Sequence, residues 1–342
     1  MKRYLFIALG AFFLAQQTFA TSFTPAQRIQ NQNSKQPKQT TDLSRLEGWT
    51  FISYYVDKNG RVKDAEIIDS SNPDKFGGEA LFYLDGYRYS PAKIDDQPVE
   101  SAQVTFFTTD KSFKGNPNDG ISRGFKRHYN DADNFIIKGN MEKAKESLKT
   151  LVEDHAKNLT EQALATWLQS LYFFKLQDWP SYGSAVRTAH YLNNYLPIEM
   201  KLKTLQNRLQ WHAFKREFSD ALYVLNELKI QSKGSLSDTQ YQSLAEDIKA
   251  QMKTSETNKI DVTVANGRAW SHRLPRSTVN LTLHEGNIDF AELRCENGRH
   301  QLNTLTSEAF TIPDNFLKCS VFVKGANGTR FSVIESGETR AF

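Results

Sequence analysis

The amino-acid sequence predicts an α+β multidomain protein, in which a small β-β-α-β domain, an all-α region and a β-rich C-terminal region follow one another. Residues 46–109 alternate aromatic and polar side chains between turn signals, residues 118–255 carry apolar residues at helical spacing, and residues after 258 return to short alternating runs. With 342 residues, the chain is long enough for two or three domains, each with its own core.

The first twenty residues have the pattern of an export signal. Lys2 and Arg3 precede the apolar run from Tyr4 to Ala15, and Ala20 provides a small residue at the expected cleavage site. An uncleaved anchor is the alternative, but this run is shorter than the roughly 20 apolar residues that cross a bilayer as a helix. We therefore expect a signal peptide at residues 1–20, cleaved near Ala20, and a mature chain outside the cytoplasm.

Composition excludes some classes of partner. Loss of the two basic residues of the signal peptide lowers the formal net charge from +4 to +2, and no block of basic residues follows, so we expect no nucleic acid partner. No later stretch is apolar for 18 residues, so we expect no membrane span in the mature chain. Residues 21–43, rich in glutamine and small polar residues, are predicted to form a flexible leader.

The first folded unit is predicted to contain three strands and one helix. Residues 49–56 and 62–68 read as strands joined by a turn that ends in Asn59-Gly60, a strong hairpin signal. Residues 73–84 have apolar residues at helical spacing, and residues 99–109 read as a third strand. Alternation in this last strand places Ala102, Val104 and Phe106 on one face and Gln103, Thr105 and Phe107 on the other.

These residues resemble the C-terminal domain of the TonB energy transducers. The resemblance covers about residues 46–110 and gives a domain at 44–112. Its features, in chain order, are Gly48, Gly60, Ser70-Ser71, Phe76, Ala80, Tyr87-Arg-Tyr-Ser-Pro91-Ala92 and Pro98-Val99. Two departures are Gly77, where the family usually has an acidic residue, and Asp85-Gly86, which interrupt the usual basic end of the helix.

The resemblance implies a Gram-negative envelope, a periplasmic location and a protein partner. In the family, the last strand accepts an extended peptide from an outer-membrane receptor by strand addition. An edge covered by the helices that follow is the alternative. The candidate partner-binding residues of this edge strand are Val99, Ser101, Gln103, Thr105 and Phe107.

Residues 118–255 contain one spacing of apolar positions three times. The copies are offset by 38 and 39 residues, as expected for stacked helix pairs, and they resemble tetratricopeptide repeats with lengthened connections. An ordinary helical bundle is the alternative. Aromatic residues between Trp167 and Tyr195 could line a peptide groove or form the core. The aligned positions are Met141, Ala144, Leu148, Leu151; Trp179, Tyr182, Val186, Ala189; and Phe218, Ala221, Leu225, Leu228.

The C-terminal region, residues 258–342, is predicted to be a β-sandwich because short strands alternate with turns every 8 to 12 residues. Cys295 and Cys319 both lie here, and export to an oxidising compartment predicts a disulfide between them. A metal site that includes His300 is the alternative, but these three side chains leave a tetrahedral ion one ligand short.

No pattern indicates catalysis. The seven histidines show no metal-binding spacing, and the sequence has no nucleophile elbow, P-loop or dinucleotide motif, so we expect no metal, no cofactor and no enzymatic activity. The sequence favours a periplasmic adaptor that binds a partner peptide and is linked to outer-membrane transport. The alternatives are an energy transducer that relies on another protein for motor coupling and, less favoured, an envelope enzyme.

Overall fold

The computed structural model describes residues 22–29, 47–109, 120–254, 256–264, 269–303 and 308–340. Within these ranges the chain is an α+β protein with eight α-helices, five sheets and one disulfide, which confirms the predicted class. The predicted signal peptide lies outside the described residues. No helix among the described residues is long and apolar enough to cross a membrane.

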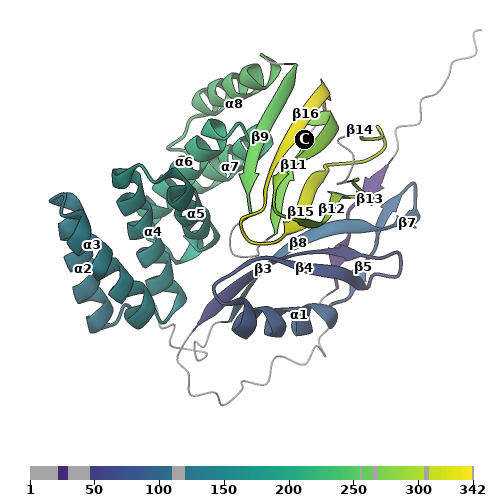
Figure 1. The fold of residues 1–342 in the computed structure, drawn as a ribbon. Helices are drawn as coiled ribbons and strands as arrows, with labels where there is room; N and C mark the ends of the chain where they lie inside the picture. The colour runs from purple at the N-terminus through teal and green to yellow at the C-terminus, as the bar shows by residue number, and fades with distance from the viewer. Residues whose placement is uncertain are drawn as a thin grey trace, which may run out of the picture.

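The N-terminal domain (residues 47–109) is built on the antiparallel sheet β4-β3-β8, with β3 in the centre. The helix α1 covers one face of this sheet, where Ile52, Tyr54 and Val56 pack against Ala80 and Leu84 (Figure 1). The predicted β-β-α-β order is present. Its elements are β3 (Gly48–Val56), β4 (Val62–Ser70), a helical turn (Pro73–Gly77) that leads into α1 (Gly78–Asp85), and β8 (Ser101–Thr109).

The turn between β3 and β4 requires glycine, as the Asn-Gly signal predicts. Gly60 has φ +74°, and a Cβ atom there would lie 1.9 Å from the carbonyl oxygen of Tyr89. Only glycine adopts this conformation at so close an approach without strain. The turn therefore fixes the β3-β4 hairpin and holds the Tyr89 strand beside it.

Short strands complete the domain and change two of the predicted boundaries. Asp95 and Asp96, with φ 47° and 64°, fold β7 back onto β6, so Val99 pairs with Ala92 instead of belonging to β8. Residues 22–29, inside the predicted flexible leader, pair with this domain through β1 and β2. These strands are β1 (Phe23–Thr24), β2 (Gln27–Arg28), β5 (Tyr89–Ser90), β6 (Ala92–Ile94) and β7 (Gln97–Val99).

The helical region consists of three antiparallel pairs that lie side by side, followed by α8 (Figure 1). The helices are α2 (Arg123–Ile137), α3 (Met141–Thr150), α4 (Leu159–Leu176), α5 (Trp179–Tyr191), α6 (Ile198–Phe214), α7 (Phe218–Gln231) and α8 (Asp238–Lys253). Helical turns follow α3 at Leu151–His155 and α5 at Asn193–Tyr195.

One turn geometry closes all three pairs. Gly139, Gln177 and Arg216 have left-handed φ values of 73°, 57° and 60°. The backbone N–H of the following residue donates to the carbonyl five positions back, at 2.9, 3.1 and 2.9 Å. This is the hydrogen bond of a Schellman helix end. The turns recur at the offsets of 38 and 39 residues found in the sequence. The tetratricopeptide-like solenoid itself stays a prediction.

The C-terminal sheets (residues 257–339) are two antiparallel four-stranded sheets, β10-β15-β12-β13 and β14-β11-β16-β9, whose residues share one hydrophobic core. Cys295 and Cys319 are bonded in that core, which confirms the predicted disulfide. Classification as a β-sandwich stays a prediction. The strands are β9 (Thr257–Thr263), β10 (Trp270–Arg273), β11 (Arg276–Glu285), β12 (Ile288–Cys295), β13 (Gly298–Gln301), β14 (Phe310–Thr311), β15 (Ser320–Gly325) and β16 (Arg330–Thr339).

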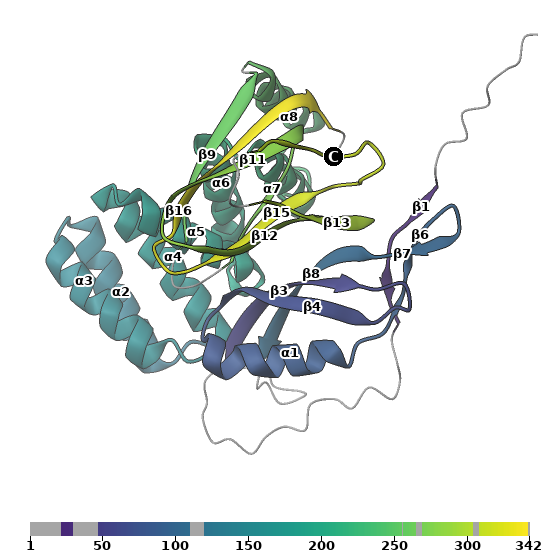
Figure 2. The same cartoon turned by 45° about the vertical axis from the view of Figure 1, so that its right-hand side comes forward.

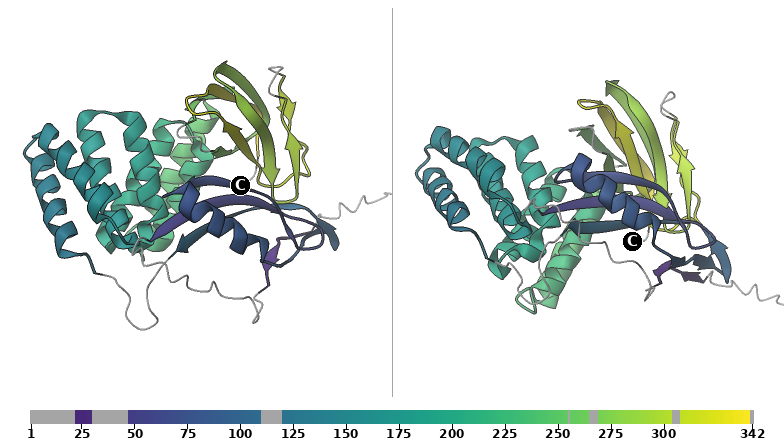
Figure 3. Two further views of the ribbon diagram at one scale, coloured as in Figure 1. Left: turned by 60° about the horizontal axis from the view of Figure 1, so that its bottom comes forward. Right: turned by 90° about the horizontal axis from the view of Figure 1, so that it is seen from below.

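The three parts meet at the face of β3 that points away from α1. Trp49 packs with Leu159 and Leu192 of the helical region, and Phe51 packs with Phe322 of the C-terminal sheets. Figure 2 shows the C-terminal sheets on one side of the β4-β3-β8 sheet and α1 on the other. In Figure 3 the helical pairs continue as a row from the same sheet. One strand therefore carries contacts to every part of the molecule.

Candidate partner-binding edge

The strand β8 forms one edge of the N-terminal sheet. It pairs with β3 along its whole length, from Gly48 opposite Thr109 to Val56 opposite Ser101. Among the described residues, no strand pairs with its other side. A free strand edge presents backbone N–H and C=O groups to which a further strand can add.

The two faces of β8 differ in how much they are covered. On the α1 side, Ser101 is fully buried and Phe107 packs against Tyr87 with 5.6 Å between the ring centroids. On the opposite side, Phe106 stacks on Trp49 at 5.8 Å, whereas Val104 is 55% exposed. A chain added to β8 would therefore find free side chains mainly in the middle of the strand and near its end.

The structure distributes the five predicted residues over different positions. Gln103 and Thr105 are half-buried on β8, and the Gln103 amide donates to the Ser101 hydroxyl at 3.0 Å. Ser101 is buried within the domain, and Phe107 packs against its hydrophobic core. Val99 lies on β7. Whether these residues bind a partner stays a prediction.

Two exposed residues of β8, Val104 and Thr108, are missing from the predicted set. Alternation in the sequence does place Val104 on the face opposite Gln103 and Thr105. It gives no sign that this face is partly open, because its coverage depends on helices and sheets that come much later in the chain.

Next to β8, Arg299 of β13 ties the C-terminal sheets to the N-terminal domain. Its guanidinium bonds Asp64 and, at 3.1 Å, Glu100, and lies 4.6 Å from the centroid of the Tyr55 ring. Burial raises the pKa of Glu100, although Arg299 acts in the opposite direction. Because Glu100 immediately precedes β8, this contact fixes the start of the strand. Both β12 and β13 lie beside β8 (Figure 2).

A second contact lies under the same sheet. Arg294 donates to the Ser53 hydroxyl at 2.6 Å and to Glu292 at 2.7 Å, and its guanidinium lies 3.8 Å from the Phe322 ring centroid. The Tyr55 hydroxyl donates to the carbonyl of Leu293 at 3.4 Å. Burial raises the pKa of Tyr55, so its hydroxyl keeps the proton that it donates. These bonds set the orientation of β12 against β3.

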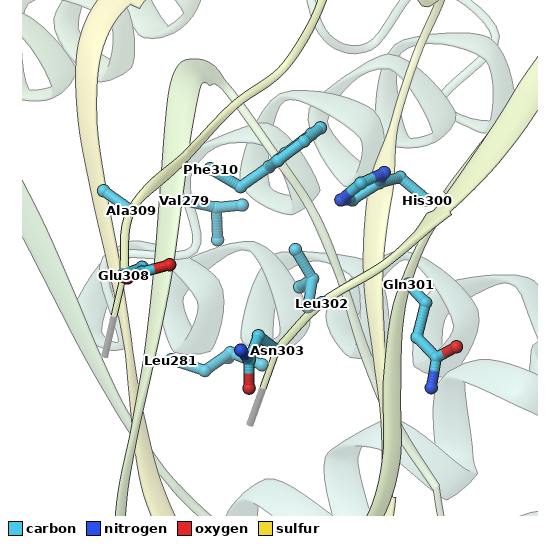
Figure 4. Close-up of a pocket in the computed structure, with 9 residues that line it drawn as sticks. All are labelled: Val279, Leu281, His300, Gln301, Leu302, Asn303, Glu308, Ala309 and Phe310. Carbon is cyan, nitrogen blue, oxygen red and sulfur yellow. The ribbon is translucent and has the colours of Figure 1, made fainter. Parts of the chain in front are cut away.

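A pocket of about 160 Å³ lies in the C-terminal sheets, between β11, β13 and β14 (Figure 4). Val279, Leu281 and Leu302 give it an apolar wall, and His300 stacks on Phe310 with 3.8 Å between the ring centroids. Ligand pockets usually measure roughly 300 to 1,000 Å³, so this one is small. In the described ranges, no group of three or more His, Cys, Asp or Glu side chains could hold a metal ion.

Fold and edge together define a class: a small β-β-α-β domain whose sheet ends in an edge strand with no further strand on its outer side among the described residues. Residues 39–107 match the family model described as the Gram-negative bacterial TonB protein C-terminal. This match confirms the resemblance seen in the sequence for this part of the chain. No curated protein matches the chain. The family match ends before the helical region and the C-terminal sheets.

Proposed function

We propose that this chain is a periplasmic adaptor that binds an extended peptide of a partner protein, such as an outer-membrane receptor, by strand addition to β8. The observation that carries the proposal is the unpaired side of β8. The helical region and the C-terminal sheets pack on the sheet face and leave this side without a paired strand among the described residues. The TonB family match makes an envelope partner the natural ligand.

In strand addition, different groups provide affinity and selectivity. Backbone hydrogen bonds along β8 would hold any extended peptide, and the side chains that alternate beside it would select among sequences. Gln103 and Thr105 offer polar groups on the α1 side, whereas Val104 and Thr108 offer an apolar group and a hydroxyl on the other side. The favoured peptide therefore alternates short apolar and polar side chains and has little charge.

The other parts of the chain act in this proposal as a scaffold. The repeated helix pairs form a tetratricopeptide-like array, and the C-terminal sheets form a sandwich that holds β8 in place through Arg294 and Arg299. Cleavage near Ala20 releases the chain into the periplasm. Mass spectrometry of the purified protein tests this step, because a retained N-terminal segment contradicts it.

Photo-crosslinking in cells tests the proposal directly. A photoreactive residue at Val104, Thr105 or Thr108 is expected to capture a partner protein. The matched control is Phe82, which is 76% exposed and lies on α1, outside β8. Strand addition is wrong if the β8 positions capture nothing while positions in the helical region do.

A further inference from the structure

A row of exposed apolar side chains follows one edge of the helical region. We call it the turn edge: the turns that join α2 to α3, α4 to α5 and α6 to α7. Ile137 is 71% exposed at the first turn, Phe174 and Trp179 are 53% and 40% exposed at the second, and Phe214 is 67% exposed at the third. Leu176, at the second turn, is 45% exposed.

Three of these side chains, at the second and third turns, form a patch because their rings touch one another. Phe174 packs on Trp179 with 5.9 Å between ring centroids, and Trp179 reaches Phe214 at 6.3 Å. Met141, directly after the first turn, and Phe173, just before the second, both pack against one buried cluster. Single exposed apolar residues are ordinary, but contiguous patches mark interaction surfaces.

Basic residues accompany the apolar ones at every turn. Ile137, Phe174 and Phe214 are each followed directly by a lysine. Lys138 and Lys175 are exposed, and at the third turn Arg216 is exposed while Lys215 donates to the carbonyl of Asp261 at 3.2 Å. The turn edge therefore presents aromatic tips beside positive charge.

The acidic residues at the second and third turns are already engaged within the protein. Asp178 accepts a hydrogen bond from the backbone N–H of Ser181 at 3.2 Å, and Glu217 bonds His212 at 2.7 Å. Glu142 at the first turn is exposed. Asp178 and Glu217 are only partly exposed, whereas Lys138, Lys175 and Arg216 are exposed, so basic residues predominate among the exposed charged side chains of these turns. This surface is complementary to an anionic one.

We infer that the turn edge binds the surface of a bilayer that contains anionic phospholipid. Aromatic and aliphatic tips enter the boundary between headgroups and acyl chains, and lysine and arginine side chains meet the lipid phosphates. The repeated turn geometry matters here, because the turns that carry these side chains close three adjacent helix pairs of one row (Figure 1). Tryptophan, phenylalanine and lysine side by side are the residues that such an interface favours.

Co-sedimentation with vesicles tests this inference. The full chain is compared with a Phe174→Ser, Phe214→Ser double variant on vesicles of phosphatidylcholine alone and of phosphatidylcholine with phosphatidylglycerol in equal parts. We expect the partition coefficient of the double variant to fall by at least about tenfold, because each phenylalanine loses its burial in the lipid. Phe82→Ser removes a phenylalanine of α1 that is more exposed than either of these, and it should leave the partition coefficient unchanged.

The charges are tested separately. Lys138→Glu with Lys175→Glu should weaken binding to the phosphatidylglycerol vesicles by about tenfold or more and have little effect with phosphatidylcholine alone. The inference is overturned if the unmodified chain does not sediment with either vesicle, or if Phe82→Ser has the same effect as the double variant. It is also overturned if light scattering shows a dimer that the Phe174→Ser, Phe214→Ser variant dissociates, because the turn edge would then bind a second copy.

Discussion

The imidazole of His272 lies between two carboxylates that come from different parts of the chain. Its Nδ1 bonds Asp220 of α7 and its Nε2 bonds Glu335 of β16, both at 2.8 Å. Burial alone would lower the pKa of His272, but Glu335 and Asp220 together raise it to about 10. At neutral pH the ring is therefore charged, and it joins the helical region to the C-terminal sheets.

Stability should decrease with rising pH because of this residue. A raised pKa in the folded state means that the contribution of His272 is complete below the ordinary histidine pKa of about 6.5 and is lost as pH rises toward about 10. We expect the free energy of unfolding to fall by about 3 to 5 kcal/mol over this range, measured by urea unfolding at a series of pH values.

The variant His272→Gln isolates this contribution from other groups that titrate near pH 10. It should be less stable than the unmodified chain at pH 6.5, because both carboxylates lose a charged partner, and the difference should shrink as pH rises. His300→Gln, at an exposed ring outside this network, provides the control. A difference between His272→Gln and the unmodified chain that does not vary with pH would contradict the assignment.

Val104 is the residue at which the proposed peptide contact can be altered with least damage to the fold. It is 55% exposed, so Val104→Lys should change the free energy of unfolding by less than about 0.5 kcal/mol. A charged edge residue opposes strand addition, and we expect partner affinity to fall about tenfold in a pull-down or titration. Val104→Thr, which keeps the branched shape, is the control. Equal affinity for both variants would place the partner elsewhere.

At the scale of elements, the turns that close the helix pairs use three different residues in one backbone conformation. Gly139 suits its φ of 73°, whereas Gln177 adopts 57° with a side chain, which costs free energy. We expect Gln177→Gly to raise the free energy of unfolding by about 0.5 to 1 kcal/mol in urea denaturation.

Two further variants check this reasoning. Gln177→Ala keeps a Cβ atom and should give no such gain. Gly139→Ala should lower stability by about 1 kcal/mol through conformation alone, since nothing lies within 4 Å of the position that its Cβ would take. If Gln177→Gly is no more stable than Gln177→Ala, the left-handed turn is not a source of strain.

Local signals account for the elements that the sequence predicts well. The Asn59-Gly60 turn needs positive φ at Gly60. The apolar spacing of the helix pairs repeats because the same type of turn joins the two helices of each pair. The faces of β8 follow from simple alternation. The candidate edge itself comes from the resemblance to the TonB C-terminal domain, which implies that the last strand accepts a peptide. The pairing of the two cysteines follows from the predicted export.

The remaining features depend on partners that are distant in the sequence. Composition suggests a flexible leader at residues 22–29, but the hairpin of β6 and β7 and the strand β5 offer it edges to pair with. The turn at Asp95 and Asp96 separates Val99 from β8, and two adjacent aspartates are not a specific signal for that turn. The exposure of Val104 depends on how the C-terminal sheets pack against the N-terminal domain. No local sequence pattern predicts this packing.

At the scale of the whole molecule, the parts are joined by hydrogen bonds as well as by apolar contacts. At the start of β3, the Glu47 carboxylate accepts a bond from the Leu159 N–H at 2.9 Å, which ties the sheet to α4. Farther along, Ser53 and Tyr55 bond Arg294 and Leu293 of β12. The strand β3 bonds both the helical region and the C-terminal sheets, and it also pairs with β8. Movement of the C-terminal sheets would therefore shift β8 as well.

The Arg294 contact provides a test of this coupling. Arg294 is 4% exposed and pairs with Glu292, so Arg294→Met leaves a carboxylate that is largely buried without its charged partner. We expect a loss of about 3 to 5 kcal/mol in the free energy of unfolding and faster proteolysis between the N-terminal domain and the C-terminal sheets. Adding Glu292→Gln should recover part of the loss, because the unpaired charge is removed.

The matched control is Arg330→Met. Arg330 and Glu285 also form an ion pair between arginine and glutamate on strands of the C-terminal sheets, but both side chains are more than half exposed, at 62% and 67%. Exposed pairs contribute little, so this variant should lose less than about 0.5 kcal/mol. If Arg294→Met costs no more than Arg330→Met, the two parts are held together by apolar contacts such as Phe51 with Phe322, and the buried arginine only fills space between them.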